Sequence, residues 1–213
     1  MKLKYISITI LLSLYSLFNF AQNQQAQQDQ SKSPLAKIIT LSGNVSLNEK
    51  IVSTQAKNTP LNAGDTLKAQ DSKSFFIVEY SDRSRFMIRD GEINIKQLAT
   101  ENSTIKLLRG TIFSYVNPTA THKFKVETKK ASFAVRGTKF WLQEDHKESY
   151  LCVCEGVVAV RNNNSLMLVN AGEDSHVANS FEALRKNKSN DLMWKMATEG
   201  FKSMGVPVTS RPK

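Results

Sequence analysis

The sequence has few of the side chains that most often carry out enzymatic chemistry. It contains three histidines and two cysteines among 213 residues. His122, His146 and His176 lie in turn-like segments where solvation is expected, and none has the His-Glu-x-x-His spacing of a zinc site. A cysteine–histidine protease would also need an orienting residue and an oxyanion motif, and neither can be identified. The sequence therefore predicts a protein that is not an enzyme, with no catalytic residue, metal ligand or cofactor.

Cys152 and Cys154 stand two positions apart in a segment that is expected to be a strand. Side chains at i and i+2 share a face, with Cβ atoms about 6–7 Å apart, whereas a disulfide needs about 3.8 Å. A local disulfide would therefore require a break in the strand. We expect two small buried apolar side chains. A distorted disulfide and a metal-binding or redox-active pair remain as alternatives.

A long apolar run occurs at the N-terminus and has no counterpart further along the chain. Lys2 and Lys4 precede an apolar stretch over residues 5–17, which is too short to span a bilayer comfortably. This layout is typical of a secretory signal peptide over residues 1–21, cleaved after Ala21. The protein is therefore expected in the periplasm or secreted, with no stable membrane span after signal cleavage. A leader that is kept as an anchor is the alternative.

Three further segments follow the leader. Residues 22–34 are rich in glutamine and poor in apolar side chains, which predicts a disordered linker. Residues 35–180 suit one domain, and residues 181–213 form a basic tail. The net charge is +10, but the positive charges are scattered along an exported chain, so nucleic acid is not an expected partner. An envelope protein or a surface polysaccharide is expected instead.

The domain shows no helical periodicity between residues 35 and 177. Turn signals recur about every ten residues, which is typical of an all-β fold. Ser74–Tyr80 is apolar on both parities and is expected to be a central strand covered on both faces. Asp90-Gly91 and Gly110 are expected to be turns between short strands. About a dozen short strands in stacked or face-to-face sheets are predicted.

One short helix is expected in the C-terminal tail. Asn190 is a suitable N-cap, and the apolar positions that follow it have helical spacing. These positions are Leu192, Met193, Met196, Ala197 and Phe201. The helix is expected to lie on an open end of the sheets, where it would cover an edge. A helix that binds a partner is the alternative.

The segment Ala131–Leu142 changes its apolar parity partway along. Phe133 and Val135 share one parity, and Phe140 and Leu142 share the other. The change falls at Arg136-Gly137-Thr138, which predicts a β-bulge at the glycine.

Arg136 stands among apolar neighbours and is therefore expected to be partly buried. A buried guanidinium needs a carboxylate, for which Glu127, Glu155 and Asp82 are candidates. An anion-binding site at Arg136 is the alternative.

Motifs spread over residues 41–173 resemble the FecR family, which is named for a periplasmic regulator of ferric-citrate uptake. The sequence departs from the family at Asp82-Arg83-Ser84, where Asp-Gly-Ser is common. The motifs that carry the resemblance are Gly43–Val45, Leu61–Leu67, Phe76–Ser84, Leu107–Ile112, Phe124–Thr128, Ala134–Phe140, Val153–Val157 and Ala171-Gly172.

The resemblance implies an extracytoplasmic all-β domain of stacked strands with β-helix-like character and no known catalytic residues. Full-length FecR regulators also carry a cytoplasmic anti-sigma segment ahead of a membrane helix. About four residues precede the apolar leader here, so direct control of a sigma factor is not expected. The most specific motifs of the resemblance indicate the fold-determining residues. These are Arg136, Gly137, Thr138, Glu155 and Gly156.

The predicted function is that of a non-enzymatic binding, scaffolding or sensory module in the cell envelope, which recognises another protein through its β-surface. The alternative is a module that binds a glycan or small ligand. Trp141 and Tyr150 are the candidate binding surface for that alternative, because sugars stack on exposed aromatic rings.

Overall fold

The computed structural model describes residues 33–53 and 56–209. The predicted signal peptide at residues 1–21, and the linker as far as residue 32, lie outside the described residues. The chain divides into the units Met1–Ser33 and Pro34–Lys213, and the fold below is that of the second. Among the described residues, no helix is both long enough and apolar enough to cross a membrane.

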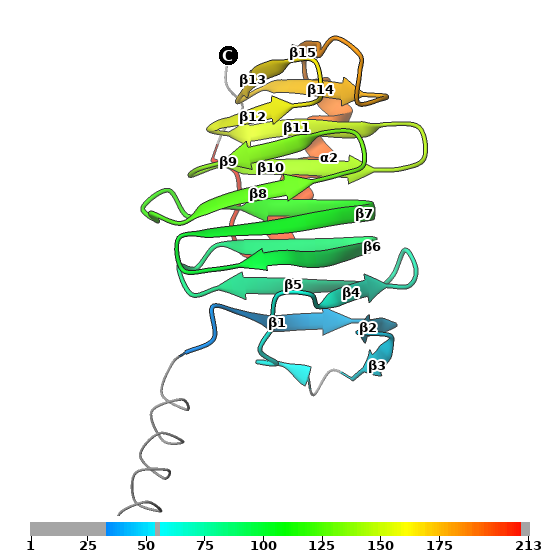
Figure 1. Cartoon of the computed structure of the whole chain (residues 1–213), viewed down its shortest axis with the longest axis vertical. Coiled ribbons are helices and arrows are strands. Elements are labelled where there is room, and N and C mark those ends of the chain that lie inside the picture. The colour runs from blue at the N-terminus through cyan, green and yellow to red at the C-terminus, as the bar shows by residue number, and fades with distance from the viewer. Residues whose placement is uncertain (1–32, 54–55, 210–213) are drawn as a thin grey trace, which may run out of the picture. The chain divides into compact units, whose positions relative to one another are not determined.

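Within the described residues, fifteen strands form one hydrogen-bonded sheet and one helix follows them, so the predicted all-β class is confirmed (Figure 1). The elements are β1 (Ala36–Ser42), β2 (Val45–Leu47), β3 (Lys50–Val52), β4 (Thr66–Ala69), β5 (Phe75–Tyr80), β6 (Arg85–Leu98), β7 (Asn102–Tyr115), β8 (Lys123–Glu127), β9 (Ser132–Val135), β10 (Lys139–Glu144), β11 (Ser149–Glu155), β12 (Val157–Arg161), β13 (Leu166–Asn170), β14 (Glu173–Val177), β15 (Lys186–Lys188) and α2 (Asp191–Ser203).

The two long strands β6 and β7 fold this sheet into two layers. The first half of β6 pairs with β5 and its second half with β4, while β7 pairs with β8 through its first half and with β10 through its second. One layer, here called the open layer, has the order β3-β2-β4-β6-β7-β8-β9-β12-β13. The other, the covered layer, has the order β1-β5-β6-β7-β10-β11-β14-β15. The predicted face-to-face arrangement is therefore confirmed. Nearly all strand pairs are antiparallel, and β7 with β8 is the parallel pair.

Both long strands bend where they pass from one layer to the other. Asp90 has φ 40° and Gly110 has φ 90°, and a Cβ atom on Gly110 would lie 2.1 Å from the Asp90 carbonyl oxygen. The prediction of chain-reversing turns at these positions was wrong. The β6–β7 ladder continues on both sides of the bend, from Arg89 opposite Thr111 to Glu92 opposite Arg109, so each strand stays intact.

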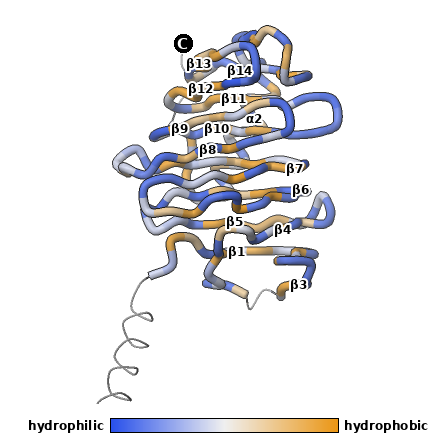
Figure 2. Tube along the Cα trace, viewed as in Figure 1, coloured by the Kyte–Doolittle hydropathy of each residue, from blue (hydrophilic) through white to orange (hydrophobic). Residues whose placement is uncertain are grey.

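The main core lies between the layers. In β5, Phe76 and Val78 point into it, whereas Ile77 faces the other way and is also buried. The prediction that this strand is covered on both faces is therefore confirmed. Each large apolar side chain buried in this way stabilises the fold by about 1.5–3 kcal/mol. Figure 2 shows hydrophobic residues recurring along the strands, whereas the connecting loops are mostly hydrophilic.

The helix α2 covers the outer face of the covered layer. Asn190 caps it, because its side-chain oxygen accepts a hydrogen bond of 2.9 Å from the Met193 N–H group, as predicted. Ala197 and Phe201 are buried in a second apolar cluster against Phe113 of β7. The predicted position at a sheet edge was wrong, because the outward side chains of β6, β7, β10 and β11 form an apolar face that the helix can bury.

The predicted bulge at Gly137 is instead a crossing between the layers. Gly137 has φ 62° and connects β9 of the open layer to β10 of the covered layer. Phe133 and Phe140 therefore enter the same core from opposite sides, although their parities differ. The parity change was a correct observation, but it marks a change of layer and not an extra residue within one strand.

Candidate functional site

The outer faces of the two layers differ in what covers them. The covered layer has α2 packed over it, whereas the corresponding face of the open layer carries polar side chains that are partly exposed. In β6, Glu92 and Asn94 alternate with the buried Ile93 and Ile95. The outer face of the open layer is therefore the polar half of strands whose other half forms the core.

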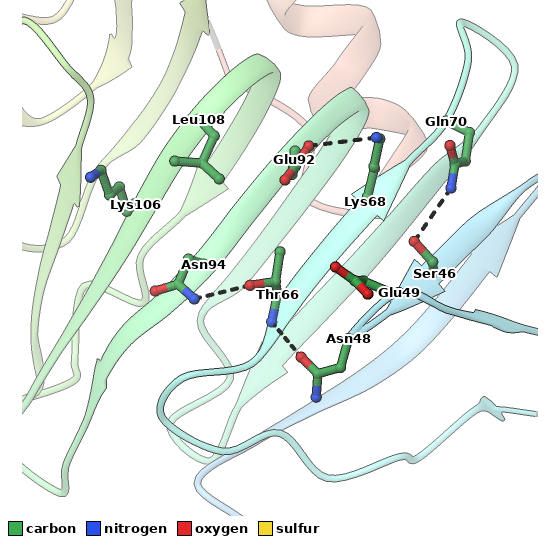
Figure 3. Close-up of a pocket in the computed structure, with 10 residues that line it drawn as sticks. All are labelled: Ser46, Asn48, Glu49, Thr66, Lys68, Gln70, Glu92, Asn94, Lys106 and Leu108. Atoms are coloured by element: carbon green, nitrogen blue, oxygen red, sulfur yellow. Dashed lines mark hydrogen bonds and ion pairs between the residues drawn. The ribbon is translucent and has the colours of Figure 1, made fainter.

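A groove of about 800 Å³ lies on this face, across β2, β4, β6 and β7 (Figure 3). Of these strands, β2, β4 and β6 are not consecutive in the sequence. The pairing of β4 with both β2 and β6 brings them together. The groove is lined by Ser46, Asn48, Glu49, Thr66, Lys68, Gln70, Glu92, Asn94, Lys106 and Leu108.

Hydrogen bonds connect several polar groups of the groove. The Asn48 side-chain oxygen accepts a 2.9 Å hydrogen bond from the Thr66 N–H group, and Asn94 Nδ2 donates to Thr66 Oγ1 at 3.1 Å. Lys68 Nζ lies 3.8 Å from Glu92 Oε2, and both are partly exposed. Lys106 has no carboxylate within ion-pair distance among the residues that the structure describes. The groove thus offers ordered amide and hydroxyl groups with one unpaired cation.

The rim of the groove is a tight hairpin turn between β2 and β3. Asn48 has φ 50° and Glu49 has φ 67°, which is the backbone of a two-residue turn with positive φ at both positions. Asn48 tolerates this conformation and also bonds Asp65 Oδ1 at 2.7 Å. The turn therefore places the Glu49 carboxylate beside the groove.

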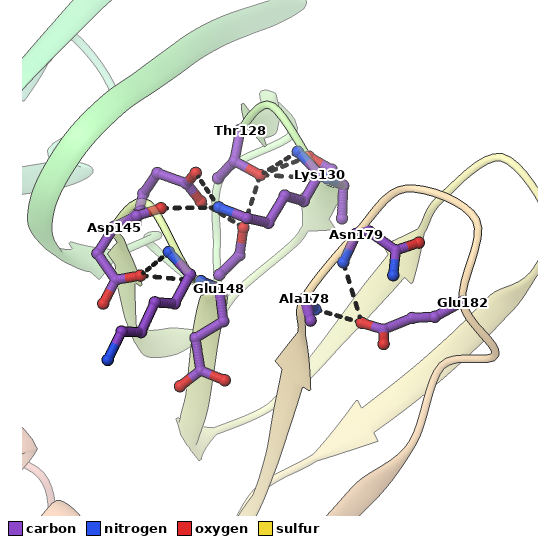
Figure 4. A network of polar contacts seen from close by, with 11 residues as sticks. Thr128, Lys130, Asp145, Glu148, Ala178, Asn179 and Glu182 are labelled. Carbon is purple, nitrogen blue, oxygen red and sulfur yellow. Dashed lines mark hydrogen bonds and ion pairs between the residues drawn. The ribbon is translucent and has the colours of Figure 1, made fainter.

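A second groove, of about 770 Å³, lies beside a network of polar contacts between the layers (Figure 4). Lys130 Nζ lies 2.6 Å from Glu144 Oε1 and donates to the Asp145 carbonyl oxygen at 2.7 Å. Ser149 Oγ donates to Glu144 Oε2 and lies 2.8 Å from Thr128 Oγ1. The network joins the β8–β9 turn to the β10–β11 hairpin. Because its polar groups bond to one another, we interpret this network as a structural contact between the layers and not as a binding site.

The predicted aromatic binding surface is buried. Trp141 is 2% exposed and Tyr150 is 3% exposed, and both lie in the apolar cluster beneath α2. The Tyr150 hydroxyl donates a 3.1 Å hydrogen bond to Asp174 Oδ2. The prediction of an exposed surface was wrong, because these outward strand positions face the helix and not solvent.

Cys152 and Cys154 are free thiols in the same cluster, as predicted. The contact with Cys152 and then burial raise the pKa of the Cys154 thiol. Both side chains are fully buried, so neither presents a nucleophile to solvent.

Arg136 is exposed, so its predicted burial was wrong. Two of its expected partners bind other residues: Glu127 pairs with Lys96 and Lys125, and Glu155 pairs with Lys139.

His122 is buried and not in a solvated loop as expected. Its Nε2 atom lies 3.0 Å from Ser103 Oγ, and its ring stacks on Phe124 at a centroid distance of 4.3 Å. Within the described residues, no group of three or more His, Cys, Asp or Glu side chains could hold a metal ion.

The other predicted fold-determining residues meet at one corner between the layers. A Cβ atom on Gly156 would lie 2.7 Å from Thr138 Cγ2 and 2.9 Å from the Gly137 carbonyl oxygen. Glu155 accepts a 3.0 Å hydrogen bond from the Thr209 N–H group and lies 2.9 Å from Lys139 Nζ. Burial opposes ionisation of Glu155, but these bonds hold its pKa below the ordinary value. The corner is distant in sequence from the groove residues, and its role in folding stays a prediction.

Sequence reasoning missed the groove. Its signal was present as polar residues on the outward parity of β4, β6 and β7, but only the apolar parity was followed. Which strands lie side by side depends on pairings between distant segments, and no local pattern indicates those.

Comparison with known proteins gives one family and two solved structures. Two crystal structures of a candidate anti-sigma factor from Parabacteroides distasonis ATCC 8503, at 1.65 Å and 2.50 Å resolution, share the fold. Identities are 18% and 19%, TM-scores 0.53 and 0.50, and 61% and 60% of this chain is covered. The chain spans 62% and 60% of the length of those structures. No curated protein matches. Residues 65–159, from the start of β4 into β12, match the family described as FecR protein, so the resemblance indicated by the motifs is confirmed for this part of the chain.

Proposed function

We propose that this chain is an exported, non-enzymatic signalling module that binds another envelope protein through the outer face of the open layer. The observation that carries the proposal is the difference between the two outer faces. The apolar one is closed by α2, and the polar one is open and holds an ordered groove with the unpaired Lys106.

The comparisons support a role in signalling. The FecR match spans the strands that build most of the groove, and the similar crystal structures are described as those of a candidate anti-sigma factor. Export rests on the signal-peptide pattern of residues 1–21. The glycan alternative loses its basis, because Trp141 and Tyr150 are buried and none of the described Phe, Tyr or Trp residues lines the groove.

Site-specific photo-crosslinking in intact cells tests the proposal. A photoreactive amino acid is placed at Lys106 or Thr66 in the groove, and at Lys195 on the exposed side of α2 as the matched control. We expect the same protein adduct from both groove positions and not from Lys195. Absence of a protein adduct at the groove positions, or equal labelling at Lys195, would overturn the proposal.

A further inference from the structure

The strand β13 is an unprotected edge of the open layer. It ends the strand order, near one end of the stack of strands (Figure 1). Its sequence, Leu166-Met-Leu-Val-Asn170, contains no charged residue and no proline. Edge strands usually carry such residues or are covered, because an uncharged edge is a template for another strand.

The other edges of the sheet are protected in these ways. The free side of β1 is covered by the segment after β3, through hydrogen bonds that include Ile38 N–H to the Thr59 carbonyl oxygen at 3.0 Å. The edge strand β15 carries Lys186 and Lys188, and the short edge strand β3 carries Lys50. Among the described edges, β13 is the uncharged one. Residues 180–184 are hydrogen-bonded to the turn before it, as Asn163 N–H is to the Ser180 carbonyl oxygen at 2.9 Å, and the backbone of Leu166–Leu168 lies beyond that contact.

Two leucines present backbone groups at this edge. Hydrogen bonds run from Asn162 N–H to the Ser165 carbonyl oxygen and from Ala171 N–H to the Gly156 carbonyl oxygen. Because hydrogen-bonded and non-hydrogen-bonded pairs alternate along an antiparallel ladder, these two bonds determine which residues of β13 bond to β12. The backbone groups of Leu166 and Leu168 therefore point away from β12. The Asn170 N–H group at the end of the strand is satisfied by Glu173 Oε2 at 2.7 Å.

An apolar patch continues from this edge across the outer face of the open layer. Leu166 and Leu168 are each 55% exposed, and Val157 is 42% exposed. Ala159 lies directly opposite both Leu168 and Ala134, so the apolar row runs over three strands. Such a patch on an open sheet face is typical of an interaction site.

Two unpaired arginines flank the patch. Arg161 lies opposite Leu166, and Arg136 follows the end of β9 where Val135 pairs with Val158. Both guanidinium groups are exposed, and neither has a carboxylate within ion-pair distance in the described part of the chain. The patch is therefore complementary to an apolar segment with acidic residues at its ends.

We infer that β13 and this patch bind an extended segment of a partner protein by strand addition. The segment carries apolar side chains at alternate positions and carboxylates at both ends. Its backbone pairs with Leu166 and Leu168, and the positive potential of the exposed Arg161 and Arg136 attracts its carboxylates. A second copy of this chain is a poorer occupant, because two strongly basic chains repel each other. The inference rests on the proposed function, for which it names the partner's binding segment.

Fluorescence anisotropy with designed peptides tests the inference on the purified protein. The acidic probe is Glu-Thr-Val-Thr-Val-Thr-Glu, the basic probe has lysine in place of glutamate, and a third probe is N-methylated at the residues that would pair with β13. We expect the acidic probe to bind at least about tenfold more tightly than either of the others.

Three variants locate the binding. Leu168→Lys and the double variant Arg136→Glu/Arg161→Glu are expected to lower the affinity for the acidic probe by about tenfold or more. The double variant is also expected to bind the basic probe more tightly than the acidic one. Leu192→Lys, at a leucine of α2 that is 66% exposed, is the control and should bind as the parent does.

Equal binding of the three probes, no binding up to about 1 mM, or full binding by Leu168→Lys would overturn the inference. A protein dimer that Leu168→Lys abolishes, without binding of the acidic probe, would show that the occupant is a second copy. If these tests fail while Lys106 still crosslinks to a protein in cells, the proposed function stands and this inference alone is wrong.

Discussion

Gly137 and Gly156 lie against each other where the chain passes between the two layers. A Cβ atom on Gly156 would lie 2.9 Å from the Gly137 carbonyl oxygen, and both residues have positive φ. Gly156→Ala is therefore expected to lower the free energy of unfolding by about 2–5 kcal/mol, from backbone strain together with crowding against Thr138. Urea denaturation measures the change.

Gly64→Ala is the matched control for Gly156→Ala. Gly64 has φ 95°, but a Cβ atom there meets nothing within 4 Å, so the expected loss is the strain alone, about 1–2 kcal/mol. Gly137→Val should also damage folding before it affects binding, because its Cβ atom would lie 3.0 Å from Pro118 Cα. Equal losses in the Gly156 and Gly64 variants, or normal thermal stability in Gly137→Val, would contradict a folding role for this corner.

The ion pair of Lys130 and Glu144 joins the two layers. It lies at the ends of β9 and β10 that are opposite to the corner at Gly137. The two side chains are 11% and 2% exposed. Lys130→Met leaves the Glu144 carboxylate buried without its cation, so we expect a loss of about 3–5 kcal/mol. Lys125→Met is the control, because Lys125 is 44% exposed and its pair with Glu127 is worth about 1 kcal/mol or less. Similar losses in the two variants would show that the pair has no special role.

Local patterns predicted the class of the fold and most of its strands. The apolar pattern on both faces of β5 and the capping residue Asn190 are local signals, and the structure confirms them. The bends at Asp90 and Gly110 were interpreted as turns, because a bend inside a long strand and a reversal use the same residues. Only the pairing of β6 with β7 on both sides of the bend distinguishes them, and that pairing joins distant segments.

Burial on the outer faces could not be predicted for a similar reason. Trp141 and Tyr150 are outward positions of β10 and β11, and Arg136 directly follows β9. The two aromatic residues lie beneath α2, whereas the arginine lies outside the area that the helix covers. The position of the helix depends on the apolar face that outward residues of four strands, β6, β7, β10 and β11, form together. Arg136 was therefore expected to be partly buried and the aromatic residues to form a surface, and both expectations were wrong.

The folded protein is expected to become less stable as the pH is lowered, because of His122. Burial lowers the pKa of this imidazole below its ordinary value of 6.5, although Asp82 opposes the shift. Below pH 6.5 the unfolded chain therefore binds more protons than the folded one, and stability decreases. Denaturation midpoints measured between about pH 7.5 and 5.5 should show this loss in the wild type and not in His122→Gln.

His146→Gln is the control for this pH dependence, since His146 is exposed. It should keep the pH dependence of the wild type. Glu155 and Glu173, whose pKa values are lowered, lose their contribution only at more acidic pH and do not enter this window. An unchanged slope in His122→Gln would assign the pH dependence to another group.

Gly200 lets α2 approach the covered layer closely. Alanine in a helix usually stabilises it by about 1 kcal/mol relative to glycine. Here a Cβ atom would lie 2.1 Å from Phe113 Cε1, so Gly200→Ala should instead destabilise the protein by about 1–3 kcal/mol and loosen the helix.

Thiol labelling measures this loosening of α2 in Gly200→Ala. Cys152 and Cys154 lie in the cluster beneath α2, so their reaction with a thiol reagent under native conditions should become faster. Glu199→Ala, at an exposed position of the same helix, should leave the rate unchanged. Slower labelling or higher stability in Gly200→Ala would mean that the helix does not depend on this contact.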